Sequence, residues 1–247
     1  MTRLNPRIDA KILEDEANGS TNGAKKTKTA SMPPKTVEQA NRILDALYDR
    51  SPTLSLCCQI SALTGLRYSD SAWLQYSDFY DKHGNFLEQV TVIQQKSYNM
   101  RLGRIGTELT KENRLSALRK SRVEIYTTQE IQKIVEESRY FSDGSEFLFA
   151  NARSKTLNEN GEVVSRPMHV VSADRHHTAV QDELKLNFNL GTHSWRKFFA
   201  LQLVRNGTTI EKIRDLLGQS SLASTDKYLH SFTQELRGEV QKVSLLE

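Results

Sequence analysis

Residues 53–65, TLSLCCQISALTG, carry apolar side chains around nearly the whole circumference of a helix. A helix that is hydrophobic all round is buried on every side, so this segment predicts a central helix with other elements packed around it. Gly65 is expected to end the helix, because glycine readily adopts the left-handed conformation that closes helices. The fold should therefore be organised around this segment.

Another helix is expected just before the central one. Thr36 and Gln39 have the spacing of a capping box, in which two side chains satisfy backbone N–H groups at a helix N-terminus. After them, Ile43, Leu44 and Leu47 recur with the period of a buried helical stripe. These residues predict an amphipathic helix packed on the central one.

Two later segments have the composition of β-strands. Residues 86–95, FLEQVTVIQQ, are rich in strand-forming side chains, and residues 122–127, RVEIYT, alternate Val123, Ile125 and Thr127 on one face. We expect the two to pair. A helix near residues 128–137 and a short strand at 146–150, EFLFA, should follow, and the polar residues 151–166 are expected to form a loop.

The C-terminal part of the chain is expected to be helical. Three short helices are marked by capping residues and glycines: Thr192 to Asn206-Gly207, then Thr208 with Glu211 as a capping box before Gly218, and a third opened by Ser220 or Ser221. The predicted class is mainly α with a small antiparallel β-sheet (α+β).

The chain has 247 residues, enough for one large domain or one domain with an appendage. Its only cysteines, Cys57 and Cys58, are neighbours in the apolar segment, which indicates buried thiols in a reducing compartment and excludes a cysteine zinc site. There is no signal peptide and no apolar run near the roughly 20 residues that span a bilayer. A cytoplasmic protein without a membrane partner is expected.

Positive charge is concentrated in one part of the chain. The formal net charge is +4 and the pI is about 9.0, which suggests a polyanionic partner. Residues 97–122 alone contain seven Lys or Arg against two Glu, a local excess of +5 that is larger than the net charge of the whole chain. This stretch is a candidate phosphate-binding surface.

Four places carry side chains suited to chemistry on an anion. Arg67 follows Gly65 in the tight connection TGLRYSD, and His193 and Arg196 share one face at a helix N-terminus, where anions are favoured. Lys96 ends the strand VTVIQQK, and Tyr228 closes a late helical segment. Taken singly, each has an ordinary alternative: a capping or solvated arginine, a chance His-x-x-Arg, an edge lysine or a packing tyrosine.

Two segments together resemble one family. TGLRYSDSAWLQYSD and GTHSWRKFFALQLVRNGTTIEKIRDLLGQSSLASTDKYLH are similar to the catalytic domain of the tyrosine recombinases, the phage-integrase and Xer class. The resemblance runs from about Thr36 to His230. It implies the following site: Arg67 as the first catalytic arginine, Asp70 as the acid after it, Lys96 as the sheet lysine, His193 and Arg196 as the His-x-x-Arg pair, and Tyr228 as the nucleophile.

The chemistry of such a site follows from its residue types. A tyrosine phenolate can cleave a DNA strand through a covalent 3′-phosphotyrosyl link. Two arginines can hold the non-bridging phosphate oxygens, His193 can donate to the phosphate or manage the tyrosine proton, and Lys96 can protonate the departing 5′-oxygen. Asp70 is expected to orient His193 or a neighbouring basic side chain, with a plain helix-start acid as the alternative. No metal or other cofactor is required.

The chain departs from the family in two places. Gln219 stands where the family usually has histidine or tryptophan, and it can donate a hydrogen bond to a phosphate but cannot carry charge. Only about 35 mostly polar residues precede the catalytic segment, too few for the core-binding domain of most relatives. We therefore expect a flexible polar tail at residues 1–33 and a catalytic domain at 34–247, a layout similar to the single-domain fimbrial-type DNA invertases; the alternatives are a fragment or a reduced mobile-element enzyme.

The resemblance implies a site-specific DNA recombinase of bacterial or phage origin, associated with the nucleoid. It should act on double-stranded DNA as a tetramer assembled through the C-terminal segment 229–247, with an accessory DNA-bending protein as a further expected partner. The alternatives are a type IB topoisomerase-like enzyme, a DNA-binding relative whose catalysis is impaired by Gln219, and a basic helical domain without enzymatic activity.

Residues 97–121 form an insertion, because a connection between paired strands normally has two to five residues. Thr110 can cap a short helix that runs to Arg119, with Leu115 and Leu118 on one side. The insertion starts beside Lys96, so we expect it to hold the DNA backbone, and the alternative is a solvated loop. The residues expected to bind DNA are Arg101, Arg104, Lys111, Arg114 and Arg119.

Overall fold

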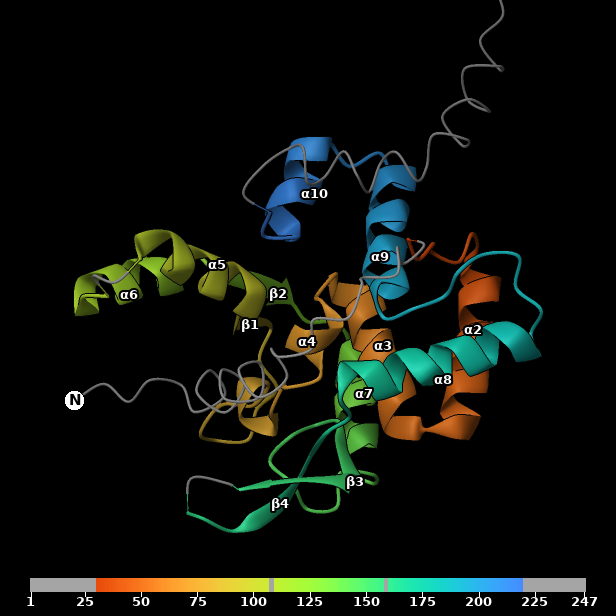
Figure 1. Ribbon diagram of the computed structural model, residues 1–247, viewed down its shortest axis with the longest axis horizontal. Helices are drawn as coiled ribbons and strands as arrows, with labels where there is room; N and C mark the ends of the chain where they lie inside the picture. The colour runs from red at the N-terminus through yellow and green to blue at the C-terminus, as the bar shows by residue number, and fades with distance from the viewer. Residues whose placement is uncertain (1–29, 107–108, 158–159, 220–247) are drawn as a thin grey trace, which may run out of the picture.

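The computed structural model describes residues 30–106, 109–157 and 160–219. Its centre is α3 (Pro52–Thr64), which is buried on all faces and packs against α2 (Val37–Arg50), α4 (Tyr68–Ser71), α7 (Gln129–Ser138) and α9 (His193–Arg205), as Figure 1 shows. Gly65 ends α3 with φ of 70°. A Cβ atom there would lie 2.5 Å from the Phe199 ring of α9, so α3 and α9 can meet closely only at a glycine. The predicted central helix is confirmed.

Helix α2 begins as predicted, with one difference. The Thr36 side chain accepts a hydrogen bond from the backbone N–H of Gln39, but the Gln39 side chain accepts from the N–H of Lys35 and not from Thr36. The second hydrogen bond of the predicted capping box is therefore made to the residue before Thr36. The predicted stripe of Ile43, Leu44 and Leu47 is buried.

The predicted strand pair is present. β1 (Gln89–Ile93) and β2 (Arg122–Tyr126) are antiparallel, with Gln89 opposite Tyr126 and Ile93 opposite Arg122. Their alternating burial places valine and isoleucine side chains inward. The predicted end of the first strand was wrong: Lys96 does not end β1 but lies in the first turn of α5 (Gln95–Ile105).

The insertion between β1 and β2 is folded. It consists of α5 and α6 (Lys111–Arg119), which extend away from the central helices in Figure 1. Thr110 caps α6 by accepting from the backbone N–H of Asn113, as predicted, whereas α5 was not predicted. A small apolar cluster built on Tyr98 and Ala117 joins the two helices, while Leu115 is exposed instead of packing beside Leu118. We call this unit the α5–α6 hairpin.

A second β-hairpin was missed. Residues 151–166 were expected to be a loop, but β3 (Ala150–Leu157) and β4 (Val163–Pro167) are antiparallel, with a register irregularity between Asn151 and Lys155. The strand expected at 146–150 contributes only Ala150 to β3, and Phe147 makes an isolated bridge to Gln75. Because β3 is exposed or half-buried beyond Ala150 and β4 buries Ser165 and Pro167, the strands lack the apolar alternation that marks a half-buried strand.

The remaining helices are partly as predicted. α7 begins after the Thr128 cap and α9 begins after Thr192, as expected. α8 (Val170–Glu183) was missed, because its buried face consists of Ala173, His177 and Val180 and gives a weak apolar stripe. The other short elements are η1 (Tyr76–Asp78) and α10 (Ile210–Leu216).

Two predictions concern the end of the described chain. Thr209, not Thr208, precedes α10, and its side chain makes no capping bond, so the predicted Thr208–Glu211 box was wrong. The predicted third helix after Ser220 lies outside the described residues, as do residues 1–29 of the expected tail. Within the described ranges, no helix combines the length and apolarity needed to cross a membrane.

Candidate active site

Arg67 lies in the connection between α3 and α4. The left-handed Gly65 turns the chain, and Arg67 becomes the residue that precedes α4. Its Nη1 atom donates a 2.7 Å hydrogen bond to Oε1 of Gln94 and lies 3.7 Å from Oδ2 of Asp70. The side chain is 15% exposed, so the guanidinium is fixed by two neighbours and still reaches the surface.

Asp70 is buried and contacts two structural elements. Its Oδ1 atom accepts a 3.0 Å hydrogen bond from the backbone N–H of Gln95, at the start of α5, while Oδ2 faces Arg67. A carboxylate at a helix N-terminus is electrostatically favourable. The structure thus places Asp70 against Arg67 and against the first turn of the helix that carries Lys96.

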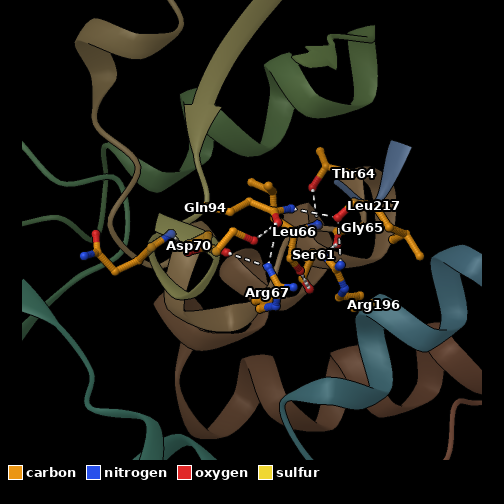
Figure 2. Close-up of polar contacts among 11 residues, drawn as sticks. Ser61, Thr64, Gly65, Leu66, Arg67, Asp70, Gln94, Arg196 and Leu217 are labelled. Carbon is orange, nitrogen blue, oxygen red and sulfur yellow. Dashed lines mark hydrogen bonds and ion pairs between the residues drawn. The ribbon is translucent and has the colours of Figure 1, made fainter. Parts of the chain in front are cut away.

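Arg196 is fully buried on α9 and is held by two backbone carbonyls. Nη1 donates to the oxygen of Gly65 at 2.6 Å, and Nη2 donates to the oxygen of Leu217 at 2.8 Å. Figure 2 shows these bonds together with those of Arg67. Because the carbonyls belong to the ends of α3 and α10, the Arg196 guanidinium ties both helix ends to α9.

Gln94 joins the two arginines and was not predicted. It is 1% exposed, its Oε1 atom accepts from Arg67, and its Nε2 atom donates to the Leu217 oxygen at 2.9 Å. That oxygen is the one that also accepts from Arg196. In the sequence Gln94 is one of two adjacent glutamines at a strand end, and nothing in that pattern distinguishes it.

His193 and Lys96 belong to the same group of charges. His193 is the first residue of α9, with an exposed side chain. Partial desolvation is the main cause that lowers the pKa of His193, followed by the positive charges of Arg196, Arg67 and Lys96; Asp174 opposes the shift. Electrostatic effects of this kind act over short distances, so the four basic residues form one cluster.

The starts of two helices add to this positive cluster. Lys96 lies in the first turn of α5, and His193 and Arg196 lie in the first turn of α9. A helix N-terminus carries partial positive charge and favours an anion; at α5 the Asp70 carboxylate already accepts from the first backbone N–H. The arrangement therefore suits a phosphate group.

Gln219 is the last residue that the structure describes. Its backbone N–H donates to the oxygen of Arg214, and that of Gly218 donates to Asp215, the bond pattern of a Schellman helix end. Gln219 thus lies two residues beyond the Leu217 carbonyl that holds Arg196. Tyr228 lies outside the described residues.

Some of the basic residues of the insertion line a small cavity between α5 and α6. A cavity of about 300 Å³ is lined by Arg101, Arg104, Ile105, Asn113, Ser116, Ala117 and Lys120. Two of the five residues expected to bind DNA, Arg101 and Arg104, line it, and Lys111, Arg114 and Arg119 do not. Lys120, which belongs to the predicted basic stretch but was not named among the DNA-binding residues, also lines it.

Known proteins resemble this chain in sequence and fold. Residues 35–235 match the phage integrase family. Tyrosine recombinase XerC of Pediococcus pentosaceus (strain ATCC 25745) is 24% identical over 213 residues, which cover 83% of this chain and 60% of XerC. The chain spans less than two thirds of the length of such XerC relatives.

Solved structures share the fold. The crystal structure of XerA recombinase has a TM-score of 0.56 and 17% identity, covering 96% of this chain and 75% of that one. A λ integrase(75-356) dimer bound to a COC′ core site has a TM-score of 0.54 and 17% identity, covering 88% of this chain and 68% of that one. Because the family match covers most of the chain, the chain belongs to the phage integrase family, and it has the tyrosine recombinase catalytic-domain fold.

Proposed function

We propose that this protein is a site-specific DNA recombinase that cleaves and rejoins DNA strands. The observation that carries the proposal is the single cluster formed by Arg67, Lys96, His193 and Arg196, drawn from three separate parts of the chain. Membership of the phage integrase family supports it. The λ integrase relative is bound to a core site, which supports double-stranded DNA as the substrate.

In the proposed reaction, Oη of Tyr228 attacks a backbone phosphorus atom. The new Tyr–phosphorus bond replaces the bond from phosphorus to the 5′-oxygen, so the 3′-phosphate remains on the enzyme and a 5′-hydroxyl is released. Lys96 supplies the proton that this departing oxygen needs. Rejoining is the reverse step, with a 5′-hydroxyl as the attacking group, and therefore consumes no cofactor.

The arginines stabilise the charge that builds up on the non-bridging oxygens. Arg67, whose side chain is partly exposed, binds the phosphate directly, and Arg196 provides a buried positive charge whose position is fixed by two carbonyls. Fixed charges of this kind need no reorganisation during the reaction. In the proposed site Asp70 positions Arg67 and the first turn of α5.

His193 is suited to proton management. Its lowered pKa favours the neutral imidazole near neutral pH, and a neutral ring can accept the tyrosine proton at one nitrogen while donating to the phosphate from the other. Gln219 is proposed to donate a hydrogen bond to the same phosphate, in the place where the family usually has histidine or tryptophan.

The α5–α6 hairpin is proposed to hold the DNA backbone next to the cleaved phosphate. The cavity presents the cations Arg101 and Arg104 from α5 and Lys120 from the residue that follows α6. Within the described residues, Nε of Arg101 and Nε of Arg114 are buried with no hydrogen-bond partner, so bound acceptors would satisfy them. Lys111 and Arg119 are proposed to add phosphate contacts outside the cavity.

The proposed assembly is a tetramer on two synapsed DNA sites. The relative solved on a core site is a dimer, which supports assembly of more than one protomer on DNA. Residues 229–247, which lie outside the described residues, would contact a neighbouring protomer, and an accessory DNA-bending protein is a further proposed partner.

This DNA substrate implies a cytoplasmic protein associated with the nucleoid, encoded by a bacterium or by a phage or other mobile element. We also propose the domain limits 1–33 and 34–247.

Covalent trapping tests the proposed activity. The protein is incubated with a pool of nicked duplexes whose sequence around the nick is randomised, so that cleavage releases a short fragment and religation fails. A protein–DNA adduct that survives denaturation is expected, and sequencing its DNA identifies the site. The Tyr228→Phe variant should bind DNA with unchanged affinity and form no adduct. An adduct with Tyr228→Phe would show that another residue attacks.

A two-site assay then distinguishes recombination from relaxation. A plasmid carrying two copies of the selected site should yield recombinant products with the wild-type protein. Relaxed plasmid without recombinants would instead indicate a type IB topoisomerase-like enzyme, and absence of any adduct would indicate a protein that only binds DNA.

A further inference from the structure

Gln94 occupies the junction between the sheet and the α5–α6 hairpin. It lies between the last residue of β1 and the first residue of α5. Its backbone N–H donates a 2.9 Å hydrogen bond to the oxygen of Ser121, which continues the β1–β2 pairing by one more step. The backbone of Gln94 is thereby fixed to the strand that returns from the insertion.

The side-chain amide of Gln94 has only one orientation that satisfies its neighbours. Oε1 accepts from Nη1 of Arg67 at 2.7 Å and from Oγ of Ser97 at 3.2 Å. Nε2 donates to the backbone oxygen of Leu217 at 2.9 Å. A flipped amide would place its NH₂ group against the guanidinium and its oxygen against a carbonyl, so the hydrogen bonds on its two sides are formed together.

The Leu217 oxygen connects Gln94 to the other arginine. It also accepts from Nη2 of Arg196 at 2.8 Å, so a chain of hydrogen bonds runs from Arg67 through Gln94 and Leu217 to Arg196, as Figure 2 shows. The end of α10 is packed tightly onto this point. A Cβ at Gly218 would lie 2.4 Å from Val123 and 3.1 Å from both terminal atoms of the Gln94 amide.

Helix α10 is attached to the rest of the domain through a limited surface. Its buried residues Ile213 and Leu217 pack with Ala200 and other α9 side chains in a cluster separate from the main core. If the end of α10 moves, the Leu217 oxygen leaves Gln94 and Arg196 at once. The sequence after Leu217 leads to Gln219 and, nine residues later, to Tyr228.

We propose that Gln94 is a positioning residue that couples the alignment of Arg67 and Arg196 to the docking of the end of α10. This inference rests on the proposed function, because it assigns the two arginines to the same phosphate. Docking of the segment that precedes the nucleophile and alignment of the phosphate-binding cations are then a single event. In a protomer in which α10 is displaced, Arg67 keeps Asp70 and Arg196 keeps the Gly65 carbonyl, but the link that aligns the two arginines is lost.

The first test needs no activity. Gln94→Met keeps the shape of the side chain and removes its hydrogen bonds, and Gln95→Met is the matched control, since Gln95 is the adjacent buried glutamine and its side chain bonds to Asn99. In ¹⁵N-edited NMR spectra of the arginine side chains, Gln94→Met should shift the signals of both Arg67 and Arg196, and the control should shift neither. A shift of Arg67 alone, or equal shifts in the control, would overturn the coupling.

A second variant tests the proposal even if Gln94→Met does not fold. Gln94→Glu keeps an oxygen that accepts from Arg67 but sets a carboxylate oxygen against the Leu217 carbonyl. The Arg196 signal should shift and the backbone amide of Gln219 should exchange its hydrogen faster, while the thermal midpoint stays close to that of the control. An unchanged Arg196 signal in this variant would overturn the proposal even if Gln94→Met fails to fold.

Kinetics then separate positioning from general damage. On an ordinary suicide duplex, Gln94→Met should form adduct about 100-fold more slowly than wild type, the loss expected from an ångström-scale displacement of a catalytic group. On a duplex with a methylphosphonate at the cleaved position, the neutral linkage has less need of the arginines, so the loss should shrink to a few fold. Equal losses on both duplexes would show that the alignment of the arginines is unaffected by Gln94 and would contradict the proposal. If the wild-type protein forms no adduct, the proposed function is refuted. The coupling between Gln94 and the two arginines is then decided by the NMR measurement alone.

Discussion

Arg196 on α9 donates a 2.6 Å hydrogen bond to the carbonyl oxygen of Gly65, the residue at which α3 ends. Arg67 follows this carbonyl by two residues, so the same short backbone segment binds one arginine and carries the other. The bond joins positions that are 131 residues apart in the sequence. The geometry of the site therefore depends on the conformation at Gly65, which is the basis of the first prediction.

Gly65→Ala should destabilise the protein and impair its site. The new methyl group meets Phe199 at 2.5 Å and Leu217 at 2.9 Å, and the backbone at φ of 70° is unfavourable for alanine. We expect a loss of about 2–4 kcal/mol in urea denaturation, combining backbone strain with overpacking. Gly84→Ala is the matched control, because φ is 82° but no atom lies near the new methyl group; it should lose only about 1 kcal/mol. Equal losses in both variants would contradict the steric explanation.

Replacing each arginine by lysine should separate stability from chemistry. Lysine cannot reach both Gly65 and Leu217, so Arg196→Lys leaves a buried carbonyl without its donor and should lose about 2–4 kcal/mol of unfolding free energy as well as adduct formation. Arg67→Lys should abolish adduct formation with a smaller loss of stability, since that side chain reaches the surface. Denaturation curves and adduct yields, measured on the same samples, give both quantities. A larger stability loss for Arg67→Lys would contradict this assignment.

Stability should fall as the pH drops below the usual pKa of histidine. Burial is the main cause that lowers the pKa of His177, whose Nε2 accepts from Trp195 Nε1 while Nδ1 faces the Ala173 carbonyl. A lowered folded-state pKa means that the unfolded chain binds more protons between that pKa and 6.5. The contribution of neutral His177 to the free energy of unfolding is therefore complete above pH 6.5 and is lost as the pH falls through the pKa of the folded state. His177→Gln keeps an acceptor for Trp195 and should flatten this dependence in thermal melts between about pH 7.5 and pH 5; an unchanged slope would point to other groups.

Neutralising the cavity of the α5–α6 hairpin should weaken DNA binding without regard to sequence. Replacing Arg101, Arg104 and Lys120 by glutamine removes cations that neutralise phosphates, and the slope of log K against log salt should flatten by about 0.9 for each phosphate that is no longer neutralised. The matched control removes three exposed cations elsewhere: Lys133, Arg175 and Lys185. Fluorescence anisotropy at several salt concentrations measures both variants. If the slope changes equally in the control, the hairpin makes no particular contribution to DNA binding and is a solvated surface.

Gln219→His should retain or increase the rate of adduct formation. An imidazole can make the same hydrogen bond to a phosphate and adds partial positive charge near neutral pH. A donor in a preorganised site contributes about 3–4 kcal/mol, so loss of this hydrogen bond would be plain in single-turnover rates. A large loss in Gln219→His would mean that the structure around the Schellman turn is adapted to the amide.

The central part of the fold could be predicted because its signals are local. The all-apolar segment of α3, the stripe of α2 and the alternation of β2 each reflect burial on a known face. β3, β4 and α8 could not be predicted in this way. β3 is exposed or half-buried beyond Ala150, the buried residues of β4 are Ser165 and Pro167, and α8 buries an alanine and a histidine, so their stability depends on pairing and tertiary contacts that leave no apolar period.

The residues of the candidate site were also predictable only where the sequence carries a local signal. Its charged members were named from motifs, and the structure brings Arg67, Asp70, Lys96, His193 and Arg196 into one region. Lys96 was assigned to a strand end because the apolar alternation stops near it, whereas the helix N-terminus that carries it has no capping side chain to mark it. Gln94 and the Leu217 carbonyl went unnoticed because a backbone oxygen has no sequence signature and a glutamine acts here only through its neighbours.

The hydrogen bond from the Gln94 N–H to the Ser121 oxygen also has a consequence for protein engineering. The α5–α6 hairpin leaves and re-enters the domain through these two paired residues, and its apolar cluster adds Ile93 of β1 to side chains of α5 and α6. Such a point of insertion tolerates changes in the length and sequence of what it carries. Exchanging the hairpin between Ser97 and Lys120 for another small domain should thus give chimaeras with altered DNA preference on an unchanged catalytic core.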